Sequence, residues 1–310
     1  MLLVILGYIY IFKKLFNMRI AVYGKHFADN FGPAIQFMFT KLVEQQAELI
    51  IYNPFAKFLY QKITLPDSYR KFVDHDDLAK EKPELLLSIG GDGTILDAIT
   101  VVRDLDLPIL GINTGRLGFL SSVAREEIST TIKHIINRDF ELEERSLIQI
   151  DKPENLFAEQ NFALNELSVL KKDSSSMITV HAFVNDQYLN SYWADGLIVA
   201  TPTGSTAYSL SCGGPILVPD AGNFVLTPIS PHNLNVRPIV IGDNNRITLR
   251  VEGRDENFLV AMDSRTASLS SNQTIEVRKA PFGIKLAKLP FQNFYHTLRN
   301  KLMWGLDKRN

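Results

Sequence analysis

The sequence predicts an α/β domain, followed by a β-rich domain and by a final helix that packs back on the first domain. In the N-terminal half, short apolar runs alternate with stretches of helical period, which indicates a parallel sheet covered by helices. Beyond about residue 140, short alternating strands separated by turn pairs such as Asn185-Asp186 replace this pattern. The length of 310 residues also exceeds one ordinary core, so two domains are expected.

The first domain is expected over residues 18–138, with elements bounded by glycine, proline and polar residues. In chain order they are a strand at 19–23, a helix at 31–46, strands at 48–52 and 85–89, a helix at 95–105, a strand at 107–113 and a helix at 126–137. The first helix is expected to bury the side chains of Ile35, Phe39, Leu42 and Val43. Residues 53–83 are polar and mixed, and no element is predicted there.

The second domain is expected over residues 139–285. Its predicted strands are 147–150, 162–170, 178–184, 187–191, 197–201, 239–241, 246–251, 258–262 and 274–279. The last segment, 286–310, carries an amphipathic helical stretch at 291–304 that is expected to return to the first domain.

The first 17 residues do not fit either domain. Residues 2–12 are almost uninterruptedly apolar, but they are too few for a membrane-spanning helix, which takes roughly 20 residues. Met18 begins a better first strand, so we interpret residues 1–17 as a non-native or disordered extension. A short membrane-association segment is the alternative.

The net charge of −1 gives no sign of general binding to nucleic acid or to an anionic membrane surface. The single cysteine, Cys212, excludes an intrachain disulfide framework and a cysteine-based zinc site, and it fits a reducing compartment. The chain contains neither a P-loop motif nor the motif set of protein kinases.

A glycine turn between the strand at 85–89 and the following helix is the first candidate site. Gly90, Gly91 and Gly93 surround the single carboxylate of Asp92, and backbone N–H groups at such a helix start hold phosphates well. Thr94 and Asp97 resemble a helix capping box. Asp92 then either meets a phosphate through a divalent cation or accepts a proton from a substrate hydroxyl. The alternative is a structural turn with an exposed carboxylate.

Three further groups of residues are candidates. Residues 195–215 follow a buried strand and are rich in hydroxyls that suit sugar and phosphate oxygens, unless they form an ordinary Ser/Thr-rich turn. Those hydroxyls belong to Thr201, Thr203, Ser205, Thr206, Ser209 and Ser211, and Tyr208 lies among them. Asn165-Glu166 is an adjacent amide and carboxylate within a predicted strand, so the two side chains are expected on opposite faces. Asp263 and Asn113 each end a strand.

Taken together, Gly90-Gly91-Asp92-Gly93-Thr94, the stretch 113–120, Asn165-Glu166 and the stretch 195–215 resemble the NAD kinase family. The four motifs match in order, and the resemblance covers residues 18–300. It implies a Rossmann-like first domain, a β-rich second domain and phosphorylation of the 2′-hydroxyl of the adenosine ribose of NAD. It also implies Mg²⁺ or another divalent cation, ATP or polyphosphate as donor, a homodimer or homotetramer, and a cytoplasmic enzyme.

The resemblance also implies roles for individual residues. Asp92 is the proton acceptor, with Gly90, Gly91 and Thr94 in the phosphate-donor loop, while Asn113 and Asp263 are given no fixed role and no metal ligand is assigned. The residues implied to contact NAD are Asp92, Gly93, Asn165, Glu166, Asp195, Thr206, Ala207, Tyr208, Ser209, Leu210 and Ser211.

The chain departs from the family pattern at three positions. Trp193 and Ser176 stand where many members carry a basic residue, which puts the corresponding phosphate contacts in doubt. Arg265 stands where glutamine or histidine is common, which could change how a phosphate or metal is held. The rival interpretations are a lipid kinase with a similar glycine turn and a non-catalytic dinucleotide sensor.

Overall fold

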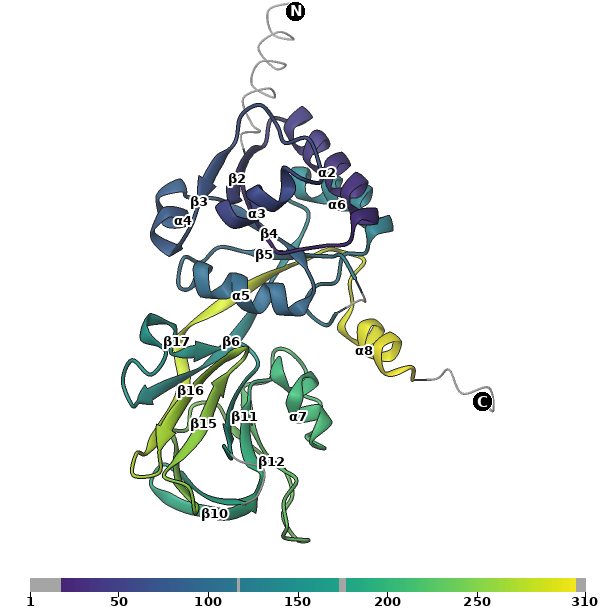
Figure 1. Ribbon diagram of the computed structural model, residues 1–310. Coiled ribbons are helices and arrows are strands. Elements are labelled where there is room, and N and C mark those ends of the chain that lie inside the picture. The colour runs from purple at the N-terminus through teal and green to yellow at the C-terminus, as the bar shows by residue number, and fades with distance from the viewer. Residues whose placement is uncertain (1–17, 116–117, 173–176, 305–310) are drawn as a thin grey trace, which may run out of the picture. The chain divides into compact units, whose positions relative to one another are not determined.

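The computed structural model describes residues 18–115, 118–172 and 177–304, which fall into two compact units (Figure 1). One unit comprises the chain up to Glu143 together with the chain from Lys285 onward, and the other comprises Glu144 to Ile284. The interpretations of residues 1–17 and of Ser176 lie outside the described residues. Within the described ranges, none of the helices has the length and apolar character needed to cross a bilayer.

The first unit contains a parallel sheet in the order β5-β4-β1-β2-β3. Its strands are β1 (Arg19–Gly24), β2 (Glu48–Tyr52), β3 (Arg70–Phe72), β4 (Leu85–Gly90) and β5 (Ile109–Asn113). Its helices are α2 (Gly32–Glu44), α3 (Asn53–Leu59), α4 (His75–Glu81), α5 (Asp92–Val102), α6 (Ile128–Asn137) and α8 (Phe294–Leu302). Side chains of α2, α3 and α6 share one apolar core with the sheet, whereas α5 packs against β4 apart from α2 and α6 (Figure 1).

The α/β architecture predicted from the sequence is confirmed, and so is the return of the C-terminal helix. In α8, Leu298 is buried, and the ammonium of Lys301 lies 5.7 Å from the centre of the Phe119 ring. Just before α8, Phe291 packs on His134 of α6 with ring centres 5.9 Å apart. The helix therefore belongs to the first unit although it comes last in the chain.

Two details of the first unit differ from the prediction. The stretch 53–83 contains α3, β3 and α4, which are too short to show a clear apolar period. On α2, Met38 is fully buried, whereas Val43 is 40% exposed. Val43 lies about 80° around the helix from Ile35, at the edge of the buried stripe.

The second unit is built from antiparallel strands in two sheets. One sheet has the order β13-β12-β11-β8-β15-β16, with β8 (Glu166–Leu170), β11 (Gly196–Ala200), β12 (Asn223–Ile229), β13 (Ile239–Gly242), β15 (Asn257–Met262) and β16 (Arg265–Ser270). The other sheet contains β9 (Ile178–Val184), β10 (Gln187–Ala194), β14 (Ile247–Glu252) and the first part of β17 (Ile275–Lys288). The strand β6 (Glu141–Lys152) pairs with β17 and also with β7 (Phe162–Ala163). Side chains from both sheets form one apolar core, with Val199 and Phe224 from the first and Val180 and Leu249 from the second.

The β-rich second unit is confirmed, but its strand list is corrected in two ways. The strands β12 and β16 were missed. The predicted strand at 162–170 is broken at residues 164–165, where β7 ends and β8 begins. Asn165 therefore lies in a break in the strand, and the expectation that Asn165 and Glu166 both belong to one continuous strand is wrong.

Candidate active site

The glycine turn lies at the carboxyl edge of the first unit's sheet. Gly90 ends β4 and pairs in register with Asn113, which ends β5. The helix α5 begins at Asp92, two residues before Thr94, with Gly91 at its N-cap and no side-chain cap. The predicted capping box of Thr94 and Asp97 is therefore wrong, because Thr94 already lies inside the first helical turn.

Gly90 has to be glycine for two reasons. Its φ of +155° is rare for residues with a side chain. A Cβ atom at this position would also lie 2.1 Å from the Thr94 hydroxyl oxygen. The turn thus keeps its backbone close to the first turn of α5, where free N–H groups point outward.

The carboxylate of Asp92 is held by the loop that follows β5. Its Oδ2 accepts a hydrogen bond from the Phe119 N–H at 2.7 Å, and its Oδ1 accepts bonds from Leu120 and Ser121 N–H at 3.1 and 2.8 Å. A Cβ atom on Gly118 would lie 1.8 Å from Asp92 Oδ1, so the loop comes this close only because residue 118 is glycine. A carboxylate offers about four acceptor positions, so one remains on Oδ2 for a further donor.

Asn113 shapes the same loop through its side chain. Its side-chain amide donates to the Ser121 carbonyl at 3.1 Å, and its side-chain oxygen accepts from the Gly115 N–H at 2.7 Å. Asn113 is only 4% exposed. These contacts give Asn113 a part in positioning the loop, which sequence reasoning did not assign to it.

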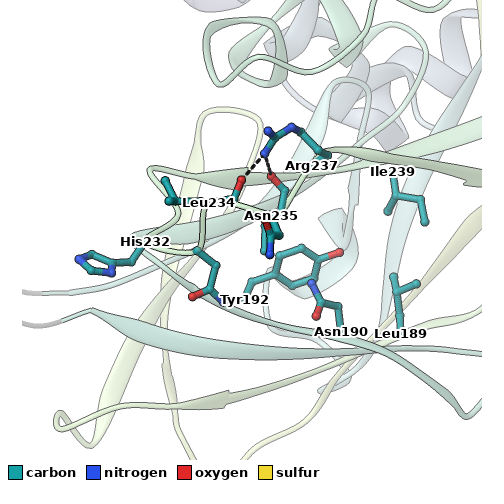
Figure 2. A pocket seen from close by; sticks show the side chains of 10 residues that line it. Leu189, Asn190, Tyr192, His232, Leu234, Asn235, Arg237 and Ile239 are labelled. Atoms are coloured by element: carbon teal, nitrogen blue, oxygen red, sulfur yellow. Dashed lines mark hydrogen bonds between the residues drawn. The ribbon is translucent and has the colours of Figure 1, made fainter.

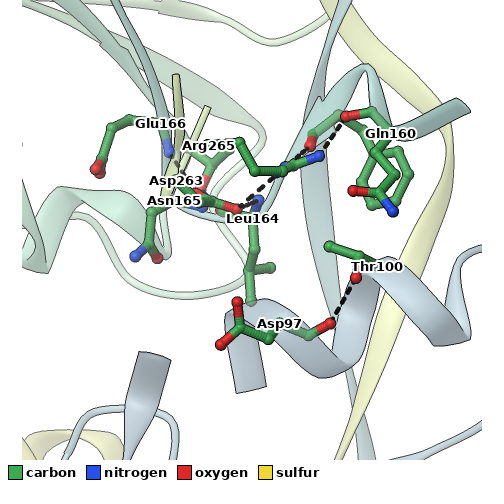
Figure 3. Close-up of polar contacts among 10 residues, drawn as sticks. Asp97, Thr100, Gln160, Leu164, Asn165, Glu166, Asp263 and Arg265 are labelled. Atoms are coloured by element: carbon green, nitrogen blue, oxygen red, sulfur yellow. Dashed lines mark hydrogen bonds and ion pairs between the residues drawn. The ribbon is translucent and has the colours of Figure 1, made fainter. Parts of the chain in front are cut away.

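The second unit brings Asn165, Glu166 and Asp263 together at the break between β7 and β8 (Figure 3). The Asp263 carboxylate accepts hydrogen bonds from the N–H groups of Asn165 and Glu166. The Glu166 Oε2 atom is buried and has no hydrogen-bond partner. Burial, and next the nearby Asp263 charge, raise the pKa of Glu166 from 4.5 to about 8, against the opposing effect of the Tyr208 N–H.

This raised pKa predicts a pH-dependent stability. Between about pH 4.5 and pH 8 the folded state keeps a proton on Glu166 that the unfolded chain releases. The free energy of unfolding therefore falls as the pH rises through this window. Glu166→Gln should flatten the fall, and urea unfolding at about pH 5 and about pH 9 measures it. Glu154→Gln, at an exposed site, is the matched control, and an unchanged fall in Glu166→Gln would contradict the assignment.

Most hydroxyls of the stretch 201–211 bond within the second unit. The Thr201 hydroxyl donates to the Leu164 carbonyl at 2.5 Å, and the Ser205 hydroxyl donates to Pro202 O at 2.7 Å. The Ser209 hydroxyl pairs with Thr227 at 2.8 Å. These side chains are buried and therefore shape the turn, so the expectation that they face sugar and phosphate oxygens is wrong for them. Ser211, with an exposed side chain, ends the short helix α7 (Tyr208–Ser211).

Asp195 and Trp193 lie at the end of β10. Asp195 pairs with the Lys171 ammonium at 2.5 Å. Trp193 packs on His232 with ring centres 4.5 Å apart, and its carbonyl accepts from the His232 N–H. His232 lines a hollow of about 600 Å³ with Arg237, whose guanidinium donates to two carbonyls of its own loop (Figure 2). Trp193 thus has a packing partner where relatives are expected to carry a charge.

The predicted site residues therefore form two groups. Gly90, Gly91, Asp92, Gly93, Thr94 and Asn113 gather at the sheet edge of the first unit. Asn165, Glu166, Asp195, Asp263 and the stretch 206–211 belong to the second unit. Among the described residues, no three His, Cys, Asp or Glu side chains form a group that could hold a metal ion.

A glycine turn at the start of a helix, at the carboxyl edge of a parallel sheet, is the arrangement of a phosphate-binding site and is typical of proteins that bind nucleotides. Residues 38–140 match the family profile of the ATP-NAD kinase N-terminal domain, and residues 164–289 match that of the ATP-NAD kinase C-terminal domain. The chain belongs to the NAD kinase family.

The relatives agree with this assignment, and two solved structures share the fold. The NAD kinases of Cytophaga hutchinsonii and Flavobacterium psychrophilum are 48% and 47% identical to this chain, over 94% of it and 100% of their own length. An NAD kinase from Archaeoglobus fulgidus in complex with ATP is 26% identical, with a TM-score of 0.71 over 91% of this chain and 99% of its own. Yeast NADH kinase complexed with NADH is 22% identical and shares the fold, with a TM-score of 0.82 over 93% of this chain and 88% of its own.

Proposed function

We propose that this protein phosphorylates the 2′-hydroxyl of the adenosine ribose of NAD to give NADP, with ATP as donor and Asp92 as general base. Membership of the NAD kinase family supports the reaction and both substrates. The geometry of Asp92 supports its role, and this observation carries the proposal. Three loop N–H groups fix the carboxylate at the start of α5 and leave one acceptor position on Oδ2.

The chemistry needs a fixed acceptor of this kind. A ribose hydroxyl is a weak nucleophile, so a carboxylate that orients it and takes its proton contributes about 10²–10⁴-fold. Phosphoryl transfer otherwise depends on positioning and on neutralising charge. The N–H groups of the Gly90–Thr94 turn serve the phosphates of the donor, apart from the Thr94 N–H, which donates to the Gly91 carbonyl at 2.9 Å.

The second unit supplies the contacts to NAD in this proposal. Asn165 and Glu166 bind the dinucleotide beside the break between β7 and β8. The further contacts come from Gly93 in the first unit and from Asp195, Thr206, Ala207, Tyr208, Ser209, Leu210 and Ser211 in the second. Since the Ser209 hydroxyl is already paired with Thr227, its contribution comes from the backbone.

The proposal includes a divalent cation as a partner of the donor. Mg²⁺ keeps several waters and is usually bound through one or two carboxylates together with substrate phosphates, so the phosphates of the donor would carry it here. The cation neutralises phosphate charge when bound, and we assign it no protein ligand. The proposal also places the enzyme in the cytoplasm as a homodimer or homotetramer.

A coupled assay tests the proposal against its rivals. The purified protein is incubated with Mg²⁺, with ATP or inorganic polyphosphate, and with NAD or NADH. The product, NADP from NAD or NADPH from NADH, is detected by cycling with an NADP-specific dehydrogenase. We expect NADP from NAD and ATP. A sensor would bind NAD in a thermal-shift measurement without turnover, and a lipid kinase would leave NAD unchanged and phosphorylate a lipid alcohol. Either result would contradict the proposal.

A further inference from the structure

Asp263 occupies a turn position that would suit glycine better. It is the first residue of the two-residue turn between β15 and β16, where Met262 pairs with Arg265. Its φ of +51° lies in the left-handed region, which aspartate tolerates better than most residues but glycine adopts freely. A carboxylate held at such a position points to a task for the side chain.

The Asp263 side chain binds the backbone at the break between β7 and β8. It is 1% exposed. Its Oδ2 accepts from the Leu164 N–H at 2.9 Å, and its Oδ1 accepts from Asn165 and Glu166 N–H at 2.8 and 3.3 Å (Figure 3). The Asp263 N–H donates in return to the Glu166 carbonyl at 3.1 Å. One buried carboxylate thus holds three successive backbone amides.

Arg265 holds the chain just before this break. Its guanidinium donates to the carbonyls of Gln160 and Phe162 and lies 5.7 Å from the centre of the Phe162 ring. One of its nitrogens is 4.0 Å from Asp263 Oδ2, so its charge also compensates the buried carboxylate. The expectation that Arg265 changes how a phosphate or metal is held finds no support in these contacts.

We propose that Asp263 is a positioning residue, which together with Arg265 holds the Asn165-Glu166 segment in the conformation that binds NAD. This inference rests on the proposed function, in which Asn165 and Glu166 contact NAD. The three amides bound by Asp263 belong to Leu164, Asn165 and Glu166, so their backbone orientation depends on its carboxylate. Asp263 itself touches no substrate in this proposal.

The charge of Asp263 affects the pKa of Glu166, so substituting Asp263 should change the pH dependence of activity. A purely structural role of Asp263 would leave that pH dependence unchanged. The ionisable groups that interact with Glu166 are Asp263, Tyr208 and Cys212, and Arg265 lies 4.0 Å from Asp263. Of these, Asp263 raises the pKa of Glu166, after the larger effect of burial. Removing the Asp263 charge should therefore lower the pKa of Glu166 and shift any activity limb that Glu166 controls to lower pH.

Three variants test the proposal: Asp263→Asn, Asp263→Gly and Arg265→Gln. Asp263→Asn places an NH₂ group against one of the backbone N–H donors. Asp263→Gly removes the backbone strain of the left-handed turn position but also removes all three hydrogen bonds to the backbone. We expect the KM for NAD to rise about tenfold or more in both, while the KM for ATP stays within about twofold. A limb of the pH–activity profile that follows the Glu166 pKa of about 8 should move to lower pH in Asp263→Asn.

The control is Asp186→Gly, which changes another aspartate at positive φ, with its side chain exposed in the turn between β9 and β10. It should leave both KM values unchanged. An unchanged KM for NAD and an unchanged pH profile in Asp263→Gly would overturn the proposal. If both Asp263 variants fail to fold, Arg265→Gln decides: the proposal requires a rise in the KM for NAD of about threefold or more, and no rise overturns it.

NAD binding by calorimetry separates this inference from the proposed function. If the wild type binds NAD but forms no NADP, the proposed function fails, and weakened NAD binding in the Asp263 variants still supports the positioning role. If the wild type forms NADP and the Asp263 variants bind NAD as tightly as it does, only the positioning role fails.

Discussion

Asp92→Asn should lower kcat by about 10²–10⁴-fold while leaving the affinity for NAD nearly unchanged. The substitution keeps the size of the side chain and removes its ability to take a proton. The asparagine side chain of this variant can still accept the Leu120 and Ser121 hydrogen bonds through its oxygen. Its NH₂ group then faces the Phe119 N–H, so one loop bond is lost.

The lost loop bond predicts a second, smaller effect. Leaving a backbone N–H without its partner costs about 1–3 kcal/mol, so thermal unfolding should shift down modestly. Asp97→Asn is the control on the same helix, because Asp97 forms a partly exposed ion pair with Lys25 that is worth about 1 kcal/mol or less. Near-normal turnover in Asp92→Asn would exclude Asp92 as the proton acceptor.

Gly118→Ala should reduce activity by about 10²-fold or more although Asp92 itself is not substituted. A methyl group at residue 118 would lie 1.8 Å from Asp92 Oδ1, so either the loop or the Asp92 side chain has to move. A displacement of about 1 Å at a reacting group is enough for such a loss. The NAD affinity should change less than kcat, because most of the proposed NAD contacts, those of Asn165 and Glu166 among them, lie in the second unit.

Steady-state kinetics and thermal unfolding of Gly118→Ala check this result together. Gly115→Ala is the matched control in the same loop, because a Cβ atom there meets nothing within 4 Å. We expect Gly115→Ala to retain far more of the wild-type kcat than Gly118→Ala. Equal kcat values for the two variants would show that the loop does not position Asp92.

The sequence predicted the elements whose pattern is local. The strand β2 (Glu48–Tyr52) falls where a short apolar run was noted, and α2 follows a helical period with Ile35, Phe39 and Leu42 buried. The glycine turn was placed correctly between β4 and α5, because a strand followed by glycines and an amphipathic run is visible within a few residues.

The remaining features depend on contacts between distant residues. The loop that holds Asp92 is 27 to 29 residues further along the chain. The break at residues 164–165 is bound by Asp263, which lies 97 to 99 residues away. No period or spacing in a single sequence encodes such pairings, and the same holds for the Ser209–Thr227 hydroxyl pair that removes a predicted site hydroxyl.

The acceptor hydroxyl is the centre of the proposed function, and NAD analogues test it most directly. One analogue lacks the 2′-hydroxyl of the adenosine ribose, and the other lacks the 3′-hydroxyl of the same ring. With ATP and Mg²⁺, phosphoryl transfer is followed as ADP release together with phosphate incorporation into the dinucleotide. We expect the 3′-deoxy analogue to be phosphorylated and the 2′-deoxy analogue to bind without being phosphorylated. Phosphorylation of the 2′-deoxy analogue would contradict the account.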